Sequence, residues 1–127
     1  MTKPVYFDYA AATPTDKRVI DTMVSCMSID GHFANPHAKD HVYCWEAAES
    51  VENAREQVAS LIGASPLEIT FTSGATESNN LAIFGAAKGL AKKGDTRRHI
   101  ITSKIEHKAI LEACEILEED GYKVTYL

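Results

Sequence analysis

The feature that most constrains this fold is a pattern of strand, turn and helix that repeats through the second half of the chain. β-Prone segments at residues 67–72, 99–102 and 123–127 alternate with segments of helical periodicity at 77–93 and 106–119. Strands that alternate with helices of this length form right-handed βαβ crossovers, which build a parallel sheet with helices on its faces. We therefore predict an α/β fold made of parallel-sheet βαβ units.

The first half of the chain contains two helical patterns that are separated by a long loop. Residues 16–27 and 45–62 carry apolar side chains every three or four positions. Residues 28–43 show no such period and are predicted to form the loop, and a short β-prone run at 5–7 precedes the first helix. The side chains expected to face inward are Val19, Ile20, Met23, Val24 and Met27 in the first helix, Ala47, Val51, Ala54, Val58 and Leu61 in the second, Leu81, Phe84, Ala87 and Ala91 in the third, and Ile110, Ala113 and Leu117 in the fourth.

Composition and charge argue against several classes of function. With 127 residues, of which 45% are apolar, the chain has the size of about one globular domain. Its formal charge of −5 comes from interspersed acidic and basic residues, so there is no basic stripe and we expect no direct nucleic-acid binding. No apolar run approaches the ~20 residues that span a bilayer, and the amino terminus lacks a secretion signal. We therefore expect no membrane association and a cytoplasmic location.

The cysteines and the end of the chain add two expectations. Cys26, Cys44 and Cys114 show no paired spacing, which predicts small buried residues in a reducing compartment and not a disulfide framework or reactive thiols. The sequence stops inside the predicted strand at 123–127, where a parallel strand would be left with an unpaired edge. We therefore expect it to belong to a longer protein.

The segment with the most distinctive chemistry is the turn Ser73-Gly74-Ala75-Thr76, which joins a β-prone run to a helix. The first amides of a helix have no partner within it and carry partial positive charge, so a phosphate placed there accepts several hydrogen bonds. The Thr76 hydroxyl can add one more, and Gly74 permits a close backbone approach. From the residues alone, an ordinary helix cap in which Ser73 or Thr76 satisfies a nearby amide is an equally good interpretation.

Three motifs in order and in register resemble one family of enzymes. They are the segments 7–14 (Phe-Asp-Tyr-Ala-Ala-Ala-Thr-Pro), 71–82 and 100–109. Together they are similar to the opening third of cysteine desulfurases of the housekeeping iron-sulfur assembly type, which are class V aminotransferase-like, fold-type I pyridoxal-phosphate enzymes. The resemblance implies that residues 16–127 form part of the cofactor-binding large domain of such a transferase. It also implies that residues 1–15 pack with a second, smaller domain that is absent from this chain.

The resemblance further implies which residues hold the cofactor. In the family, the turn that matches Gly74, Ala75 and Thr76 holds the cofactor phosphate. The histidine that matches His107 stacks on the pyridine ring and is implicated in proton transfer, a role that suits the acid–base chemistry of imidazole. Without the resemblance, a histidine at the start of a helix would be interpreted as a capping or surface residue.

The loop around Asn35 carries a further resemblance and one alternative. Asn35 and His41 keep the family pattern near the mouth of the active site, so Asn35 is a predicted substrate-binding residue, whereas Ala34 and His37 replace the usual Gly and Ser. From spacing alone, His37, His41 and Cys44 are a possible zinc-binding group. No fourth ligand is evident and the resemblance accounts for His41, so we predict no metal site.

Two parts of the family's catalytic machinery are expected to lie outside this chain. His107-Lys108 resembles the His-Lys pair whose lysine forms the Schiff base with pyridoxal 5'-phosphate. In the family, however, the Glu-His-Lys motif found here precedes that segment by a long stretch of sequence, so we assign Lys108 no catalytic role. The cysteine that carries the persulfide lies in a later loop rich in serine and alanine, which none of the three cysteines matches.

For the full-length protein, the resemblance implies a cysteine desulfurase that removes sulfur from L-cysteine and gives alanine and an enzyme persulfide for iron-sulfur cluster assembly. Its partners would be iron-sulfur scaffolds and other sulfur-acceptor proteins, and it would be a homodimer. A helix terminus contributes at most about 2 kcal/mol to anion binding, whereas micromolar affinity needs about 8 kcal/mol, so we expect the chain alone to be inactive. The alternatives are a fragment of a selenocysteine lyase or class V aminotransferase, and a non-enzymatic binding module of the same fold.

Overall fold

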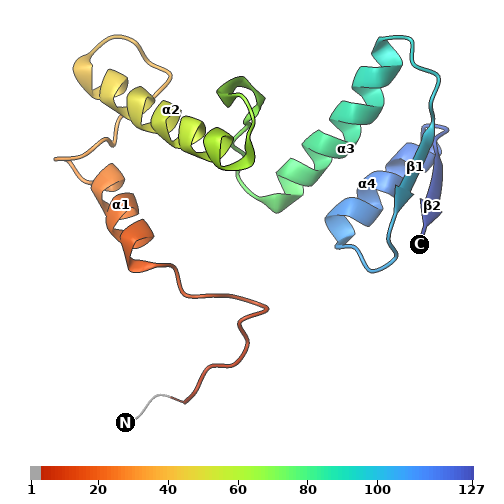
Figure 1. Cartoon of the computed structure of the whole chain (residues 1–127), viewed down its shortest axis with the longest axis horizontal. Helices are drawn as coiled ribbons and strands as arrows, with labels where there is room; N and C mark the ends of the chain where they lie inside the picture. The colour runs from red at the N-terminus through yellow and green to blue at the C-terminus, as the bar shows by residue number, and fades with distance from the viewer. Residues whose placement is uncertain (1–3) are drawn as a thin grey trace. The chain divides into compact units, whose positions relative to one another are not determined.

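The structure, a computed structural model, describes residues 4–127, which divide into two compact units (Figure 1). Unit 1 extends to Ile69 and unit 2 runs from Thr70 to Leu127. The elements are α1 (Lys17–Met27), α2 (Val42–Ile62) and the 3-10 helix η1 (Pro66–Glu68) in unit 1, and α3 (Ala75–Lys92), β1 (His99–Thr102), α4 (Lys108–Glu119) and β2 (Lys123–Tyr126) in unit 2. The parallel pairing of β1 with β2 confirms the α/β class. Among residues 4–127, no helix is both long enough and apolar enough to cross a membrane.

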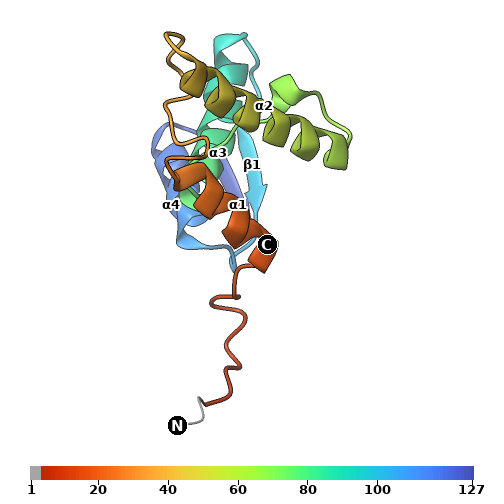
Figure 2. The same ribbon diagram turned by 90° about the vertical axis from the view of Figure 1, so that its left-hand side faces the viewer.

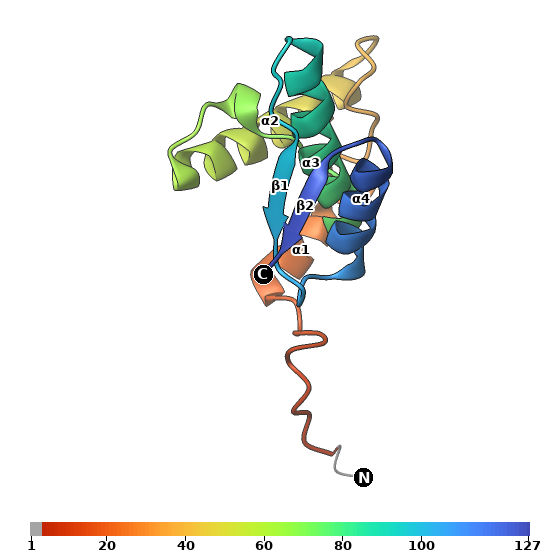
Figure 3. The same cartoon turned by 90° about the vertical axis from the view of Figure 1, so that its right-hand side faces the viewer.

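Unit 2 is built on the parallel strands β1 and β2, which α4 connects. The register pairs His99 with Lys123 and Thr102 with Tyr126. Helices α3 and α4 lie on the same side of the two strands (Figures 1 and 3). The buried side chains of the unit come from these helices and are Ala87, Ala109, Ala113, Cys114 and Leu117. Because most of them are alanine, α3 and α4 can pack closely against each other, and Leu117 on α4 is fully buried.

Both helices of unit 2 begin at the end of the unit where β1 finishes (Figures 1 and 3). In open α/β sheets, ligands bind outside the carboxyl ends of the strands, because loops and helix amino termini meet there. The turn before α3 and the loop before α4 both lie at this end. The topology therefore brings the two motifs predicted to contact the cofactor to the same end of unit 2.

Unit 1 is centred on α2, which supplies its buried side chains Cys44, Ala47 and Ala59 among the residues described. The helix begins at Val42, three residues earlier than expected, and the loop at 28–41 connects it to α1 (Figure 2). It ends at Gly63, whose φ of 69° lies in the left-handed region that glycine adopts without strain.

The inward face predicted for α1 is wrong, because its apolar side chains are exposed. Asp16 caps this helix, with Oδ1 accepting from the Arg18 N–H at 2.8 Å, so the helix forms through local interactions. Burial, in contrast, requires a second surface, and no described element of unit 1 covers this face. The exposed side chains are Val19, Ile20, Met23, Val24 and Met27 on α1, with Ala54, Val58 and Leu61 on α2 and Leu81 on α3.

The strand predicted at residues 67–72 is also wrong. Its first part forms η1, because the Ser65 N–H donates to the Glu68 carboxylate at 2.8 Å and the Ser65 hydroxyl completes a capping box. The Ile69 carbonyl then accepts from Nη1 of Arg55 at 2.6 Å. The capping box and the bond from Arg55 occupy backbone groups that a neighbouring strand would have to pair.

The short β-prone run at residues 5–7 forms no strand. The Tyr6 hydroxyl donates to the Asp8 carbonyl at 2.7 Å and lies 3.1 Å from the Ala12 carbonyl, and the Ala11 N–H donates to the Asp8 carbonyl and closes a turn. Within residues 4–127, no strand pairs with this run. A β-prone sequence does not form a strand without such a partner.

Candidate functional site

The turn before α3 leaves the first amides of the helix without a side-chain cap. Gly74 is the N-cap residue and has an extended backbone, with φ of 164° and ψ of 179°. No side chain caps this end of the helix, so the alternative interpretation of Ser73 or Thr76 as the cap is wrong. The Ser78 N–H makes the first intrahelical bond, to the Gly74 carbonyl at 3.1 Å. The N–H groups that precede it in α3 are therefore available to an outside acceptor.

The position of Gly74 fits a bound anion. A Cβ atom built on Gly74 would meet no atom within 4 Å, and an extended backbone accepts any residue. The close backbone approach expected at this glycine is therefore not made by the described part of this chain. Open space beside uncapped amides is what the oxygens of a phosphate group require, so the residues of this turn fit the phosphate of the cofactor that the resemblance implies.

Side chains around the turn are tied to one another. The amide and the hydroxyl of Ser73 both donate to Oε2 of Glu77 at 2.7 Å. The hydrogen bond from the Ser73 hydroxyl, and to a lesser extent the one from the Ser73 amide, lowers the pKa of the Glu77 carboxyl below its usual value. Desolvation acts in the opposite direction. On the side that precedes the turn in sequence, the Thr72 hydroxyl lies 3.2 Å from the Gly74 carbonyl and 2.6 Å from the Ser78 hydroxyl. Thr72 has one hydroxyl proton, so if it donates to Gly74, Ser78 donates to Thr72.

This set of contacts was not predicted from the sequence. The available signal was the spacing of Ser73 and Glu77, which is one residue longer than that of a capping box. Further along α3, Nδ2 of Asn80 donates to the Thr76 carbonyl at 2.8 Å. In the part of the chain that the structure describes, the Thr76 hydroxyl makes no hydrogen bond. The hydroxyl of Thr76 and the first amides of α3 are therefore the donors of the turn that remain open.

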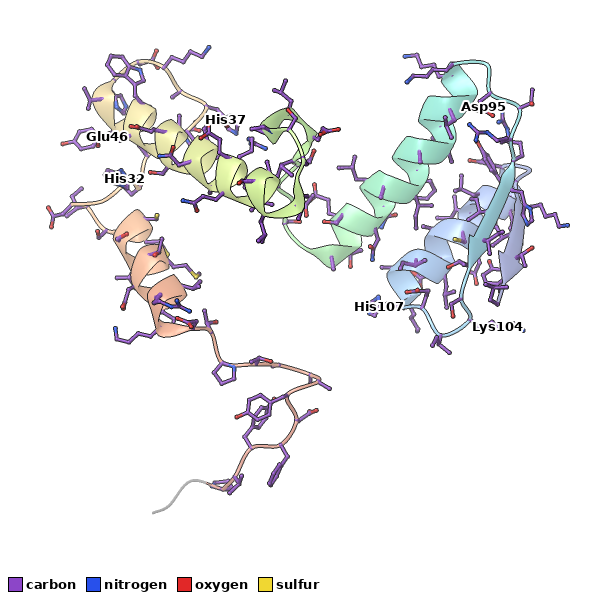
Figure 4. The ribbon with its side chains drawn as sticks, viewed as in Figure 1. His32, His37, Glu46, Asp95, Lys104 and His107 are labelled. Carbon is purple, nitrogen blue, oxygen red and sulfur yellow. The ribbon has the colours of Figure 1, made fainter. Side chains whose placement is uncertain are left out.

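His107 is the N-cap residue of α4, and Figure 4 shows it at the end of unit 2 opposite Asp95. Its Nδ1 accepts from the Ala109 N–H at 3.2 Å. Because Nδ1 is the acceptor, the neutral ring carries its proton on Nε2. The residue is exposed. The cap thus fixes the orientation of the imidazole through one nitrogen and leaves Nε2–H and the ring faces free for another role.

The loop that leads to His107 is fastened to the sheet. The Lys104 N–H donates to the Leu127 carbonyl at 2.9 Å, and the Leu127 N–H donates to the Thr102 carbonyl at 2.8 Å. Figure 4 shows Lys104 in this loop, close to the end of β1. Lys108, to which we assign no catalytic role, is exposed and begins α4. The ladder of β1 and β2 therefore sets the position of the loop that precedes His107.

Asn35 belongs to unit 1, whereas Gly74, Ala75, Thr76 and His107 belong to unit 2. Oδ1 of Asn35 accepts from the His37 N–H at 3.0 Å, and its carbonyl accepts from the Ala38 N–H at 3.2 Å. The side chain of Asn35 therefore orders its own loop, as asparagine commonly does in turns.

The zinc alternative is not supported. In residues 4–127, no three histidine, cysteine, aspartate or glutamate side chains are grouped in a way that could hold a metal ion. Nε2 of His41 lies 3.4 Å from Sγ of Cys44, which is buried. Cys114 is also buried, and burial and the nearby Glu118 raise the pKa of its thiol. Cys26 is only half-buried, so the expectation of buried cysteines holds for two of the three.

Comparison with known proteins identifies the family. Residues 5–127 match the family of class V aminotransferases. The cysteine desulfurases IscS of Vibrio atlanticus and Colwellia psychrerythraea are each 58% identical to this chain over 127 residues, which is 100% of this chain and 31% of each relative. The chain therefore spans roughly a third of the length of these relatives.

Solved structures show the same similarity. A NifS-like protein gives a TM-score of 0.83 at 42% identity, over 97% of this chain and 32% of that one. A structure described as SspA in complex with cysteine gives a TM-score of 0.80 at 48% identity, over 96% and 33%. Because the family match extends from residue 5 to residue 127 and the arrangement of helices and strands agrees with these structures, this chain belongs to the class V aminotransferase family and corresponds to the amino-terminal portion of its cysteine desulfurases.

Proposed function

We propose that this chain supplies the amino-terminal part of a pyridoxal-phosphate-dependent cysteine desulfurase, and that Gly74, Ala75 and Thr76 hold the phosphate of the cofactor. The observation that carries the proposal is the uncapped start of α3 in a chain of this family. The whole protein would act as a cytoplasmic homodimer that removes sulfur from L-cysteine for iron-sulfur scaffolds and other acceptors. The similarity to a structure described as SspA in complex with cysteine supports cysteine as the substrate.

The proposed roles follow from the position of each residue. The Ala75 and Thr76 amides and the Thr76 hydroxyl would donate to phosphate oxygens, and Gly74 would leave them room. His107 would stack on the cofactor and move a proton through Nε2, the nitrogen that its cap leaves free. When bound, the cofactor supplies an electron-withdrawing ring that stabilises negative charge on the substrate. Asn35 would contact the substrate from a loop that its own side chain orders.

We also propose that residues 16–127 are part of the cofactor-binding large domain and that residues 1–15 pack with a smaller domain outside this chain. Support comes from Val5 and Phe7, which are 76% and 87% exposed and which such a domain would bury. The chain alone is proposed to be inactive. A helix terminus supplies at most about 2 kcal/mol toward anion binding, and that corresponds to affinities of only tens of millimolar.

The phosphate turn can be tested by amide chemical shifts in the nitrogen-15-labelled chain at constant ionic strength. We expect inorganic phosphate and pyridoxal phosphate to shift the Ala75 and Thr76 amides, with saturation in the tens of millimolar range, and we expect pyridoxal, which lacks the phosphate, to leave them in place. The amide of Ala109 is the internal control. It also lies in the first turn of a helix, but His107 already accepts its hydrogen bond. Equal shifts at Ala75 and Ala109, or equal shifts with pyridoxal, would contradict the proposal.

A further inference from the structure

The hydrogen bonds that Glu77 accepts differ from those of an ordinary capping box at the start of a helix. In a capping box, the third residue of the helix accepts from the N–H of the N-cap residue. Glu77 is that third residue in α3, but its Oε2 accepts from the amide and the hydroxyl of Ser73, which lies one residue before the N-cap Gly74. The two contacts use every donor that Ser73 possesses.

We propose that Glu77 is a positioning residue for the phosphate turn. By accepting both hydrogen bonds from Ser73, Glu77 leaves the amides of Ala75 and Thr76 as the donors that bind the phosphate. The inference rests on the proposed function of the turn. Without the hydrogen bonds to Glu77, the N–H and the hydroxyl of Ser73 would be two further donors to an anion, and they lie before Gly74 in the chain. They would draw an anion toward the segment that precedes Gly74 and away from the axis of α3, along which the helix dipole acts.

The negative charge of Glu77 opposes phosphate binding, whereas its hydrogen bonds to Ser73 favour the proposed position of the phosphate. A carboxylate close to a phosphate repels it, and this repulsion weakens anion binding. Here one carboxylate oxygen takes both Ser73 donors at 2.7 Å, and these hydrogen bonds also lower the pKa of the carboxyl. Oε2 of the Glu77 carboxylate is therefore occupied by its hydrogen bonds with Ser73. A variant that removes the charge but keeps the acceptor will separate the two effects.

A further hydrogen bond, which does not involve Glu77, also holds the turn in place. The hydroxyls of Thr72 and Ser78 lie 2.6 Å apart and join the segment that precedes the turn to α3. We therefore expect α3 to form in Glu77 variants, and helix content by circular dichroism will verify this. The variants needed are Glu77→Gln, Glu77→Ala and Glu112→Ala. The last is the control, because it removes one exposed negative charge from α4 in the same unit.

Two measurements on the labelled 127-residue chain test the inference: the hydrogen-exchange rate of the Ser73 amide, and the set of amides shifted by inorganic phosphate. In the unsubstituted chain and in Glu112→Ala, we expect a protected Ser73 amide and phosphate shifts at Ala75 and Thr76 only. In Glu77→Ala, Ser73 should exchange at least tenfold faster and join the shifted amides, since its acceptor is gone. In Glu77→Gln, the amide oxygen still accepts, so Ser73 should stay protected.

The possible failures are distinguishable. If phosphate shifts Ala75 and Thr76 in the unsubstituted chain, but the Glu77→Ala variant leaves Ser73 protected and outside the shifted set, the positioning role alone is overturned. If Glu77→Gln behaves like Glu77→Ala, the role of Glu77 is its charge, and the inference is again overturned. If phosphate shifts no amide of the turn in the unsubstituted chain, the proposed function of the turn fails, and the positioning role fails with it.

Discussion

Leu117 is expected to contribute more to the stability of unit 2 than any other single side chain. It is fully buried, with a relative exposure of 0%, and lies on α4, which packs against both α3 and β2. Replacement of a buried leucine by alanine removes transfer free energy and leaves a cavity, at a combined cost of about 2–5 kcal/mol. A folded unit of this size typically has an unfolding free energy of only about 3–9 kcal/mol. Leu117→Ala should therefore remove a large part of the stability of unit 2.

The assay must report on unit 2 itself. The amide signals of β1 and β2, followed by NMR as urea is added, do so, whereas the fluorescence of Trp45 reports on unit 1. Leu81→Ala is the matched control, because Leu81 lies on α3 and is 52% exposed. Its truncation removes a smaller transfer term and leaves no closed cavity, so we expect a cost of about 1 kcal/mol or less. Leu117→Met, which nearly conserves volume, should cost less than about 1.5 kcal/mol.

The result that would refute this reasoning is equal destabilisation by Leu117→Ala and Leu81→Ala. It would mean that the two leucines are buried to a similar extent in the folded chain, and that the packing of α4 against α3 and β2 does not dominate the stability of unit 2. A cost below about 1 kcal/mol for Leu117→Ala would lead to the same conclusion.

Two further predictions concern charged side chains. The side-chain and then the backbone hydrogen bond from Arg97 lower the pKa of Asp95 from 3.8 to about 2, so its stabilising contribution is present above pH 3.8 and is lost as the pH falls through 2. We expect Asp95→Asn to remove that part of the acid dependence of unfolding, and an unchanged acid profile would contradict the assignment. For Lys108, we expect no mass increase after incubation with pyridoxal phosphate and borohydride reduction, and no alanine release from cysteine. Stoichiometric labelling that Lys108→Ala abolishes would overturn the exclusion of this lysine.

The helices were predictable because their signals are local. Caps and periodicity placed the starts of all four α-helices within three residues of those observed. Strands depend on partners that are distant in sequence. The segment at 99–102 forms a strand because the backbone of 123–126 pairs with it, whereas the equally β-prone segment at 67–72 has no such partner among the described residues and follows its local capping box. Inward faces were predictable only where a second element covers them, as α3 and β2 pack against α4, on which Leu117 is fully buried.

In the candidate site, too, some features were predictable from local sequence and others were not. The small residues of the turn and the position of His107 at the start of a helix were predictable, because residue type and helix boundaries determine them. The partner of Ser73 was not, since Ser73 can donate to several acceptors within a turn and only the side-chain conformation of Glu77 decides among them. The residues proposed to serve the site come from the family resemblance. The structure adds which of their donors remain free.

The cap made by His107 restricts how position 107 can change in evolution or in protein design. The side chain at this position must accept a hydrogen bond from the Ala109 N–H, or the start of α4 loses about 1 kcal/mol. Asparagine, aspartate, serine and threonine meet that requirement, whereas lysine or phenylalanine does not. A lineage that gives up the imidazole can therefore keep α4 intact most easily through these short polar residues or through glycine, which costs little at an N-cap. The start of the helix thus limits which new chemistry can be tried at this site without a loss of stability.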